Sequence, residues 1–278
     1  MTIFVLKIIA ALTMLIDHTA DVFHLYMSPE TCSFLRGIGR IAFPLYLFML
    51  LEGFKHTKSI ERYISKILYL AAISQIPYSI VFETVKPPSF FHINTIDGAF
   101  VIFILGCIVM LFAYKSFAAI PVCVASVCVI VRVSWCNHVL LGDELNILYA
   151  LAATLIILYA LQHRTDMTMI EFSSYCMTAL SLAYFADAGI TCILIGVLCF
   201  YLSDSNQTTT FILISILVVR TLFVYDMPKY YVIFIVISGI FMLLYNGKLG
   251  PDFKKFFYYF YPGHLILLAI THILLDIA

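Results

Sequence analysis

Four ionisable residues interrupt the first long apolar stretch of the chain, residues 3–23. They are Lys7, Asp17, His18 and Asp21. A charged side chain near the middle of a bilayer costs about 2.5–3.5 kcal/mol on insertion scales, so such residues usually face a bundle interior and mark a functional site. An imidazole exchanges protons near neutral pH. We therefore interpret His18 as a general base in a membrane-embedded site, with a polar cluster that only pins helix packing as the alternative.

The helical repeat decides which of these side chains meet. Asp17 and Asp21 lie four residues apart on one face, and His24 extends that face. His18 lies three residues from Asp21, which is also a facing relation, whereas Asp17 and His18 point about 100° apart. We expect Asp21, or less favourably Asp17, to orient the His18 imidazole. Asp17 is expected to pair with a cation on a neighbouring helix.

The second apolar stretch, residues 35–54, supplies such a cation. Gly37 and Gly39 near its start permit close helix approach. Arg40 is the expected partner of Asp17, with snorkelling to the outer interface as the alternative. Glu52 lies near the inner end of this stretch, where a pocket role and a simple interfacial position are equally well supported.

Three further residues are candidates for a substrate pocket. Tyr261 and His264 flank Pro262-Gly263 in the last apolar stretch, and a helix break there would make His264 line a pocket. Hydrogen bonding between helices is the alternative for His264. Asn94 begins the fourth apolar stretch, where a pocket role and a helix cap are equally compatible with its amide. We expect Arg40 or His264 to stabilise a developing oxyanion.

Basic residues near the inner side could hold the phosphates of a nucleotide-like donor such as coenzyme A. The residues that we assign to this role are Lys7, Lys55, Lys58, Arg62 and Lys66. The commoner explanation for a basic loop at residues 55–66 is the excess of Lys and Arg in cytoplasmic loops of membrane proteins.

The composition is that of an integral membrane protein. Of the 278 residues, 63% are hydrophobic and 12% are charged, and the mean hydropathy is +1.03. We predict one all-α domain, residues 1–278, in which about ten or eleven apolar helices form a polytopic transmembrane bundle. The expected spans are 3–27, 35–54, 63–84, 97–115, 117–135, 144–162, 168–186, 187–203, 208–225, 229–246 and 257–277.

Charge and cysteine usage limit the partners. More Lys and Arg fall in the loops on the side of the N-terminus, which predicts a cytoplasmic N-terminus in the inner membrane. The formal net charge is zero, so nothing indicates nucleic acid as a partner. The eight cysteines lack metal-binding spacing, so we expect no metal, while Cys32 and Cys136 lie on one side and are compatible with a disulfide.

The segments around these candidates resemble the TraX family. They are LKIIAALTMLIDH, GRIAFPLYLFMLLEGF, SQIPY, the Asn94 segment and the terminal FFYYFYPGHLILL. The family is named for a conjugal-transfer protein that N-acetylates pilin. A looser similarity is to membrane acyltransferases that carry an Arg and a His with ten residues between them in their first helix, a pattern in which Lys7 replaces the Arg before His18. This resemblance implies acyl-coenzyme A entering from the cytoplasm, with the His as base.

Together these observations predict an acetyl- or acyltransferase. Acetyl-coenzyme A or another acyl-coenzyme A would be the donor, and the acceptor at the outer side would be a protein N-terminus, a glycan or a small molecule. Two other classes stay open. Buried Asp and His chains also serve proton-coupled transporters, and an assembly protein for surface appendages would need no chemistry at all.

Overall fold

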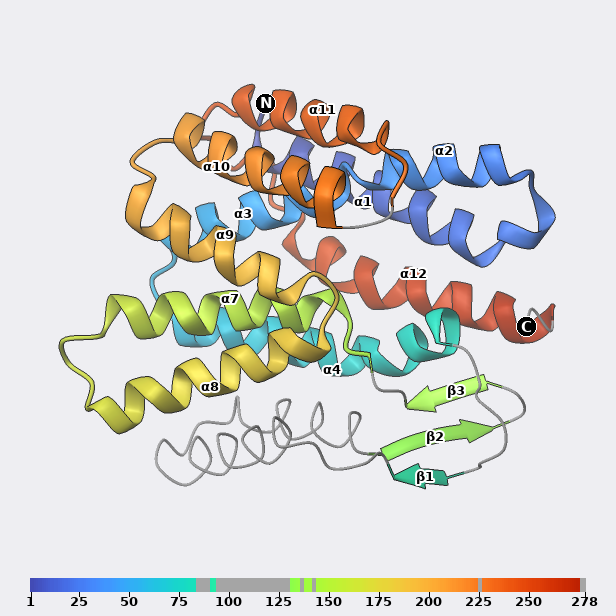
Figure 1. Ribbon diagram of the computed structural model, residues 1–278, viewed down its shortest axis with the longest axis horizontal. Helices are drawn as coiled ribbons and strands as arrows, with labels where there is room; N and C mark the ends of the chain where they lie inside the picture. The colour runs from blue at the N-terminus through green and yellow to red at the C-terminus, as the bar shows by residue number, and fades with distance from the viewer. Residues whose placement is uncertain (84–90, 94–130, 136–137, 142–143, 225–226, 276–278) are drawn as a thin grey trace. The chain divides into compact units, whose positions relative to one another are not determined.

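The computed structural model describes residues 1–83, 91–93, 131–135, 138–141, 144–224 and 227–275. This part of the chain divides into two compact units. The first contains Met1–His56 and Leu198–His264, and the second contains Thr57–Val197 and Leu265–Ala278. Figure 1 labels the helices and strands of both units.

The first unit holds the predicted catalytic and pocket residues that the structure describes, which are Asp17, His18, Asp21, Arg40, Glu52, Tyr261 and His264. Its helices are α1 (Ile3–Val22), η1 (His24–Tyr26), α2 (Pro29–Gly39), α3 (Ala42–His56), α10 (Asn206–Val219) with its π-helical continuation η2 (Arg220–Val224), α11 (Tyr231–Leu243) and the first half of α12 (Lys254–Leu274). Within this unit α1 packs on α2 and α3, and α10 packs on α11 (Figure 1).

Local signals in the sequence explain where the first helices begin and end. The Thr2 side chain accepts a hydrogen bond from Val5 N at the start of α1, and Ser28 caps α2 immediately before Pro29. The expected span at 35–54 proves to be two helices, because α2 ends at Gly39 and the Arg40 N–H donates to Gly37 O at 3.0 Å. This break places Arg40 at a junction between helices.

The second unit consists of helices and a small sheet. Its helices are α4 (Ile60–Phe82), α7 (Ile147–Gln162), α8 (Met169–Phe185), most of α9 (Gly189–Leu202) and the second half of α12. Strands β1 (Phe91–Ile93), β2 (Val131–Trp135) and β3 (His138–Leu141) form an antiparallel sheet in the order β1-β2-β3.

The prediction of an all-α polytopic membrane protein is confirmed. Five helical segments of the described chain are long and apolar enough to cross a membrane, and α7, α9 and α11 are shorter apolar helices. The predicted helix at 117–135 is wrong at its end, where β2 pairs with two neighbouring strands instead. The rest of that span and the span at 97–115 lie outside the described residues.

A buried amide network holds α4 against α7 in the second unit. The Gln75 amide nitrogen donates to Glu144 O at 2.7 Å, and its oxygen accepts from the Asn146 side chain at 2.9 Å. Asn146 also donates to Ala71 O at 2.9 Å and accepts from Leu148 N at 3.1 Å, which caps α7. The amide in the SQIPY segment therefore has a structural role.

We expect Asn146→Ala to destabilise the protein by about 2–4 kcal/mol. The substitution removes a helix cap and leaves the buried Gln75 amide short of a partner. Thermal unfolding in detergent measures the effect. The matched control is Asn246→Ala, because Asn246 is exposed and its side chain accepts one bond, from Lys248 N at 3.1 Å. Equal melting temperatures for the two variants would contradict the role of the network.

Candidate active site

An ion-pair cluster joins α1 to the α2–α3 junction. The Arg36 guanidinium pairs with the Asp21 carboxylate, and its Nε lies 3.7 Å from Asp17 Oδ1. Arg40 Nη2 lies 4.0 Å from the same oxygen, so the expected pairing of Asp17 with Arg40 is present. The two carboxylates thus face two guanidinium groups, and the local charges balance.

Arg36 is the member of this cluster that sequence reasoning missed. It lies in the last turn of α2. The signal was present in the spacing: Asp17 and Asp21 are four residues apart, and so are Arg36 and Arg40. Two helices that carry matching pairs at this spacing can form two ion pairs at adjacent turns.

Gly39 permits the close approach that the ion pairs require. A Cβ at this position would overlap the side chain of Asp17. We expect Gly39→Ala to push α1 away from α2 and to lower stability by about 1–3 kcal/mol. Unfolding in detergent measures this loss.

Gly263 in α12 offers the matched control for Gly39. A Cβ there would meet nothing within 4 Å, so Gly263→Ala should leave the melting temperature unchanged or raise it slightly. A Gly39→Ala protein as stable as the Gly263→Ala protein would show that the helices do not need this contact.

His18 and His264 form an imidazole pair between α1 and α12. His18 Nδ1 lies 2.9 Å from His264 Nε2, and the rings stack at a centroid distance of 5.1 Å with 20° between their planes. His264 is 6% exposed. His264, rather than the expected Asp21, is therefore the orienting partner that the structure gives to His18 Nδ1, while Asp21 pairs with Arg36.

The hydrogen bonds determine which ring nitrogen is basic. His264 Nδ1 lies 2.9 Å from Phe260 O, and a carbonyl oxygen only accepts, so His264 Nδ1 carries a hydrogen. In the neutral ring His264 Nε2 then accepts, and His18 Nδ1 must donate to it. The neutral His18 ring consequently has its lone pair on Nε2, the nitrogen that can take a proton from a substrate.

Two features of α12 bring His264 to this position. Tyr261 is buried, and its ring lies edge-on to the His264 imidazole with centroids 5.5 Å apart. The expected helix break at Pro262-Gly263 is wrong, because α12 runs continuously from Lys254 to Leu274. His264 is thus held by a continuous helix and by the bond from its Nδ1 to Phe260 O, not by a local opening of the helix.

Glu52 forms a separate cluster at the other end of α3. Its carboxylate oxygens lie 3.2 Å from Lys55 Nζ and 3.7 Å from His56 Nε2, and Lys55 also donates to Thr209 at 3.4 Å. Only 7% of the Glu52 side chain is exposed. This arrangement ties α3 to α10 and does not bring Glu52 to the imidazole pair.

The remaining predicted residues lie in other places. Asn94 and Cys136 are outside the described residues, and Lys58, Arg62 and Lys66 belong to the second unit. Cys32 is a free thiol whose Sγ lies 3.5 Å from Ala20 O. Within the described part of the chain, no three His, Cys, Asp or Glu side chains are grouped to hold a metal ion.

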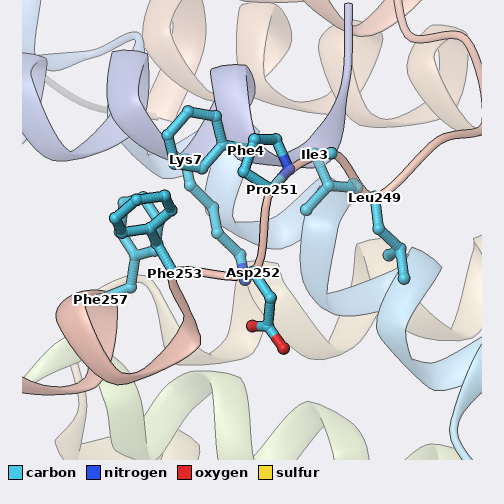
Figure 2. Close-up of a pocket in the computed structure, with 9 residues that line it drawn as sticks. Ile3, Phe4, Lys7, Leu249, Pro251, Asp252, Phe253 and Phe257 are labelled. Carbon is cyan, nitrogen blue, oxygen red and sulfur yellow. The ribbon is translucent and has the colours of Figure 1, made fainter.

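Lys7 lies in an open pocket at the start of α1 and α12. The lining residues are Ile3, Phe4, Lys7, Leu249, Gly250, Pro251, Asp252, Phe253 and Phe257. Figure 2 shows the Lys7 side chain passing the phenyl rings and extending toward Asp252. Its Nζ lies 5.5 Å from the centre of the Phe257 ring.

Comparison with known proteins gives one family. A family model described as TraX protein matches residues 3–142 and 117–272. Among curated proteins, the chain is 25% identical over 280 residues to "Probable fimbrial assembly protein FimC, serogroup H1" of Dichelobacter nodosus, a match that covers 98% of this chain and 96% of the relative. No solved structure matches the chain.

Proposed function

We propose, from the premise that the chain belongs to the TraX family, that this multi-pass membrane protein is an acyltransferase. It moves an acyl group, in the first instance acetyl, from cytoplasmic acyl-coenzyme A to an amine or hydroxyl at the outer side of the inner membrane. The observation that carries the proposal is the His18–His264 pair, which leaves a defined basic nitrogen on a membrane helix. An imidazole in this tautomer is suited to general base catalysis.

The reaction then proceeds by proton transfer through His18. Its Nε2 removes a proton from the acceptor amine or hydroxyl as that atom attacks the thioester carbonyl. The carbon–sulfur bond breaks, and the departing sulfur takes the proton back from the imidazolium as free coenzyme A. The acyl group remains on the acceptor, so one acyl bond is formed for each thioester consumed.

Arg40 is positioned to stabilise charge that develops during this attack. Its buried Nε has no hydrogen-bond acceptor among the residues that the structure describes, while its Nη2 faces Asp17. The guanidinium also lies 5.5 Å from the centre of the Tyr231 ring, which limits its movement. A fixed N–H donor with spare capacity is what an oxyanion requires. Asp17, Asp21 and Arg36 then act by holding this helix junction.

The acceptor is proposed to be the N-terminus of a surface-appendage subunit. The name of the Dichelobacter nodosus relative connects that protein with fimbrial assembly, and the family resemblance includes N-acetylation of a pilin. A glycan or a small molecule with an amine or hydroxyl group would attack the thioester in the same way. Purified protein given labelled acetyl-coenzyme A and a peptide with a free N-terminus should release coenzyme A and label the peptide in equal amounts.

A proton-coupled transporter is the second candidate. The observation that favours it is the hydrogen-bonded imidazole pair, since linked His residues also relay protons. Thermal stabilisation by coenzyme A favours the enzyme, because a ligand that binds the folded state must stabilise it. Proton flux through proteoliposomes without an acyl donor favours the transporter. An assembly protein without catalysis predicts that replacing the intramembrane charges leaves pilus formation intact.

A further inference from the structure

We propose that the Lys7 pocket binds the adenine ring of the acyl-coenzyme A donor, an inference that rests on the proposed function and assigns a place to one end of its substrate. The pocket has a volume of about 140 Å³ and opens to solvent, so it could enclose only one end of a large ligand. Like other small-molecule sites, it combines apolar walls with a few polar groups. Its walls come from two segments far apart in sequence (Figure 2).

Phenyl rings from both segments form the apolar wall. The ring of Phe4 lies 5.4 Å from that of Phe253 at an angle of 38°, and 6.1 Å from that of Phe257 at 74°. Aromatic side chains arranged in this way are the usual platform for a nucleobase, which offers a flat π face.

The polar groups of the pocket match the edge of adenine. The Lys7 ammonium only donates hydrogen bonds, and the Asp252 carboxylate only accepts them. Figure 2 shows the Lys7 side chain extending toward Asp252. Adenine presents an amino group, which donates, next to a ring nitrogen, which accepts. An adenine ring seated on the phenyl wall can therefore donate to Asp252 and accept from Lys7. The exposed Lys248 and Lys255 lie on either side of the pocket segment 249–253, where their ammonium groups would bind the phosphates.

Backbone bonds hold the pocket in shape. Ile3 N donates to Lys248 O and Phe4 N donates to Leu249 O, both at 3.0 Å. The next residue, Gly250, has a φ of +78°, and a Cβ there would lie 2.6 Å from Thr2 Oγ1. The loop can thus lie directly against the start of α1 only because this position is glycine. A wall held by main-chain bonds needs little reorganisation on binding.

The same helix faces connect this pocket to the imidazole pair. Lys7 and His18 are eleven residues apart, which is about three turns, so both lie on one face of α1. Phe257 and His264 are seven residues apart, about two turns, on one face of α12. The two faces meet at both levels, at Lys7–Phe257 and at His18–His264. The long pantetheine arm of coenzyme A would run between them and carry the thioester to His18.

Coenzyme A binding to the full-length protein in detergent, measured by calorimetry, tests this assignment. We expect Phe253→Ala to weaken binding about tenfold or more, as loss of a base-stacking ring does. The matched control is Phe256→Ala, because Phe256 is a similarly exposed phenylalanine of the same region that does not line the pocket. Asp252→Asn should weaken binding as well, because Asp252 lines the pocket and its carboxylate is the proposed acceptor.

Three results would overturn the assignment in different ways. If the wild type binds coenzyme A and Phe253→Ala binds it equally well, the pocket is not the donor site, although the proposed function stands. If the wild type binds no coenzyme A, the proposed function fails with it. If anionic phospholipid stabilises the protein through Phe253 and coenzyme A does not, the pocket is a lipid headgroup site.

Discussion

The His18→Ala protein should lose acetyl transfer by a factor of about 10²–10⁴ and still fold and bind coenzyme A. Removing a general base costs this much when nothing replaces it. His18 Nε2 is the basic nitrogen in our account, because Nδ1 donates to His264 at 2.9 Å. The rate of coenzyme A release with saturating acceptor measures the effect. A large fall in kcat with an unchanged KM for acetyl-coenzyme A is the expected pattern.

His24→Ala is the control for this loss. His24 begins η1, just beyond the end of α1, where it is exposed and its Nδ1 lies 2.7 Å from Asp21 O. Full activity is expected from this variant. If the His18→Ala protein turned over at the wild-type rate, His18 would not be the general base, even if the wild-type protein transferred acetyl groups.

The His264→Phe protein should lose activity nearly as severely, by about 10²–10⁴-fold, while donor binding is kept. Phenylalanine preserves the stacked ring but offers no acceptor to His18 Nδ1. Without that acceptor His18 can rotate or place its hydrogen on Nε2, and a His in the wrong tautomer is a poor base. If His264 had a purely structural role, the His264→Phe protein would be less stable, but the fraction that remains folded would have the wild-type kcat.

The conservative variant His264→Gln separates these two explanations. The glutamine carbonyl can still accept from His18 Nδ1, so partial recovery of kcat relative to His264→Phe is expected. The two variants should have similar melting temperatures in detergent. Equal kcat values for glutamine and phenylalanine at this position would contradict a role for His264 in orienting the base.

Local sequence signals predict the helices of this protein well. Long apolar runs require helices in lipid because the backbone must satisfy its own hydrogen bonds. The Asp17–Arg40 pair also follows from local facts, since each charge needs an opposite charge within a bundle. The strand at Val131–Trp135 was missed because a short, valine-rich apolar run is compatible with both a helix and a strand.

The position of Arg36 shows how a helix boundary changes a site. A second span that begins at residue 35 leaves Arg36 at the membrane edge, where it needs no partner. The Ser28-Pro29 pair is a helix start signal, and a helix that begins there places Arg36 one turn before Arg40. Reading that signal would have predicted the pairing with Asp21.

The imidazole pair could not be predicted from the sequence alone. His18 and His264 are 246 residues apart, and no periodicity relates them. The expected orienter, Asp21, satisfies the helical spacing but finds a stronger partner in Arg36. Which of several compatible partners a side chain takes depends on how helices pack, and that packing is a property of the whole bundle.

Transfer across a membrane tests the central claim most directly. Proteoliposomes containing the purified protein are supplied with labelled acetyl-coenzyme A on one side and with a peptide that has a free N-terminus on the other. We predict that label appears on the peptide, that free coenzyme A appears in equal amount on the donor side, and that His18→Ala abolishes both. A wild-type protein that binds coenzyme A but transfers no label to the peptide, to an amino sugar or to an alcohol would contradict the account.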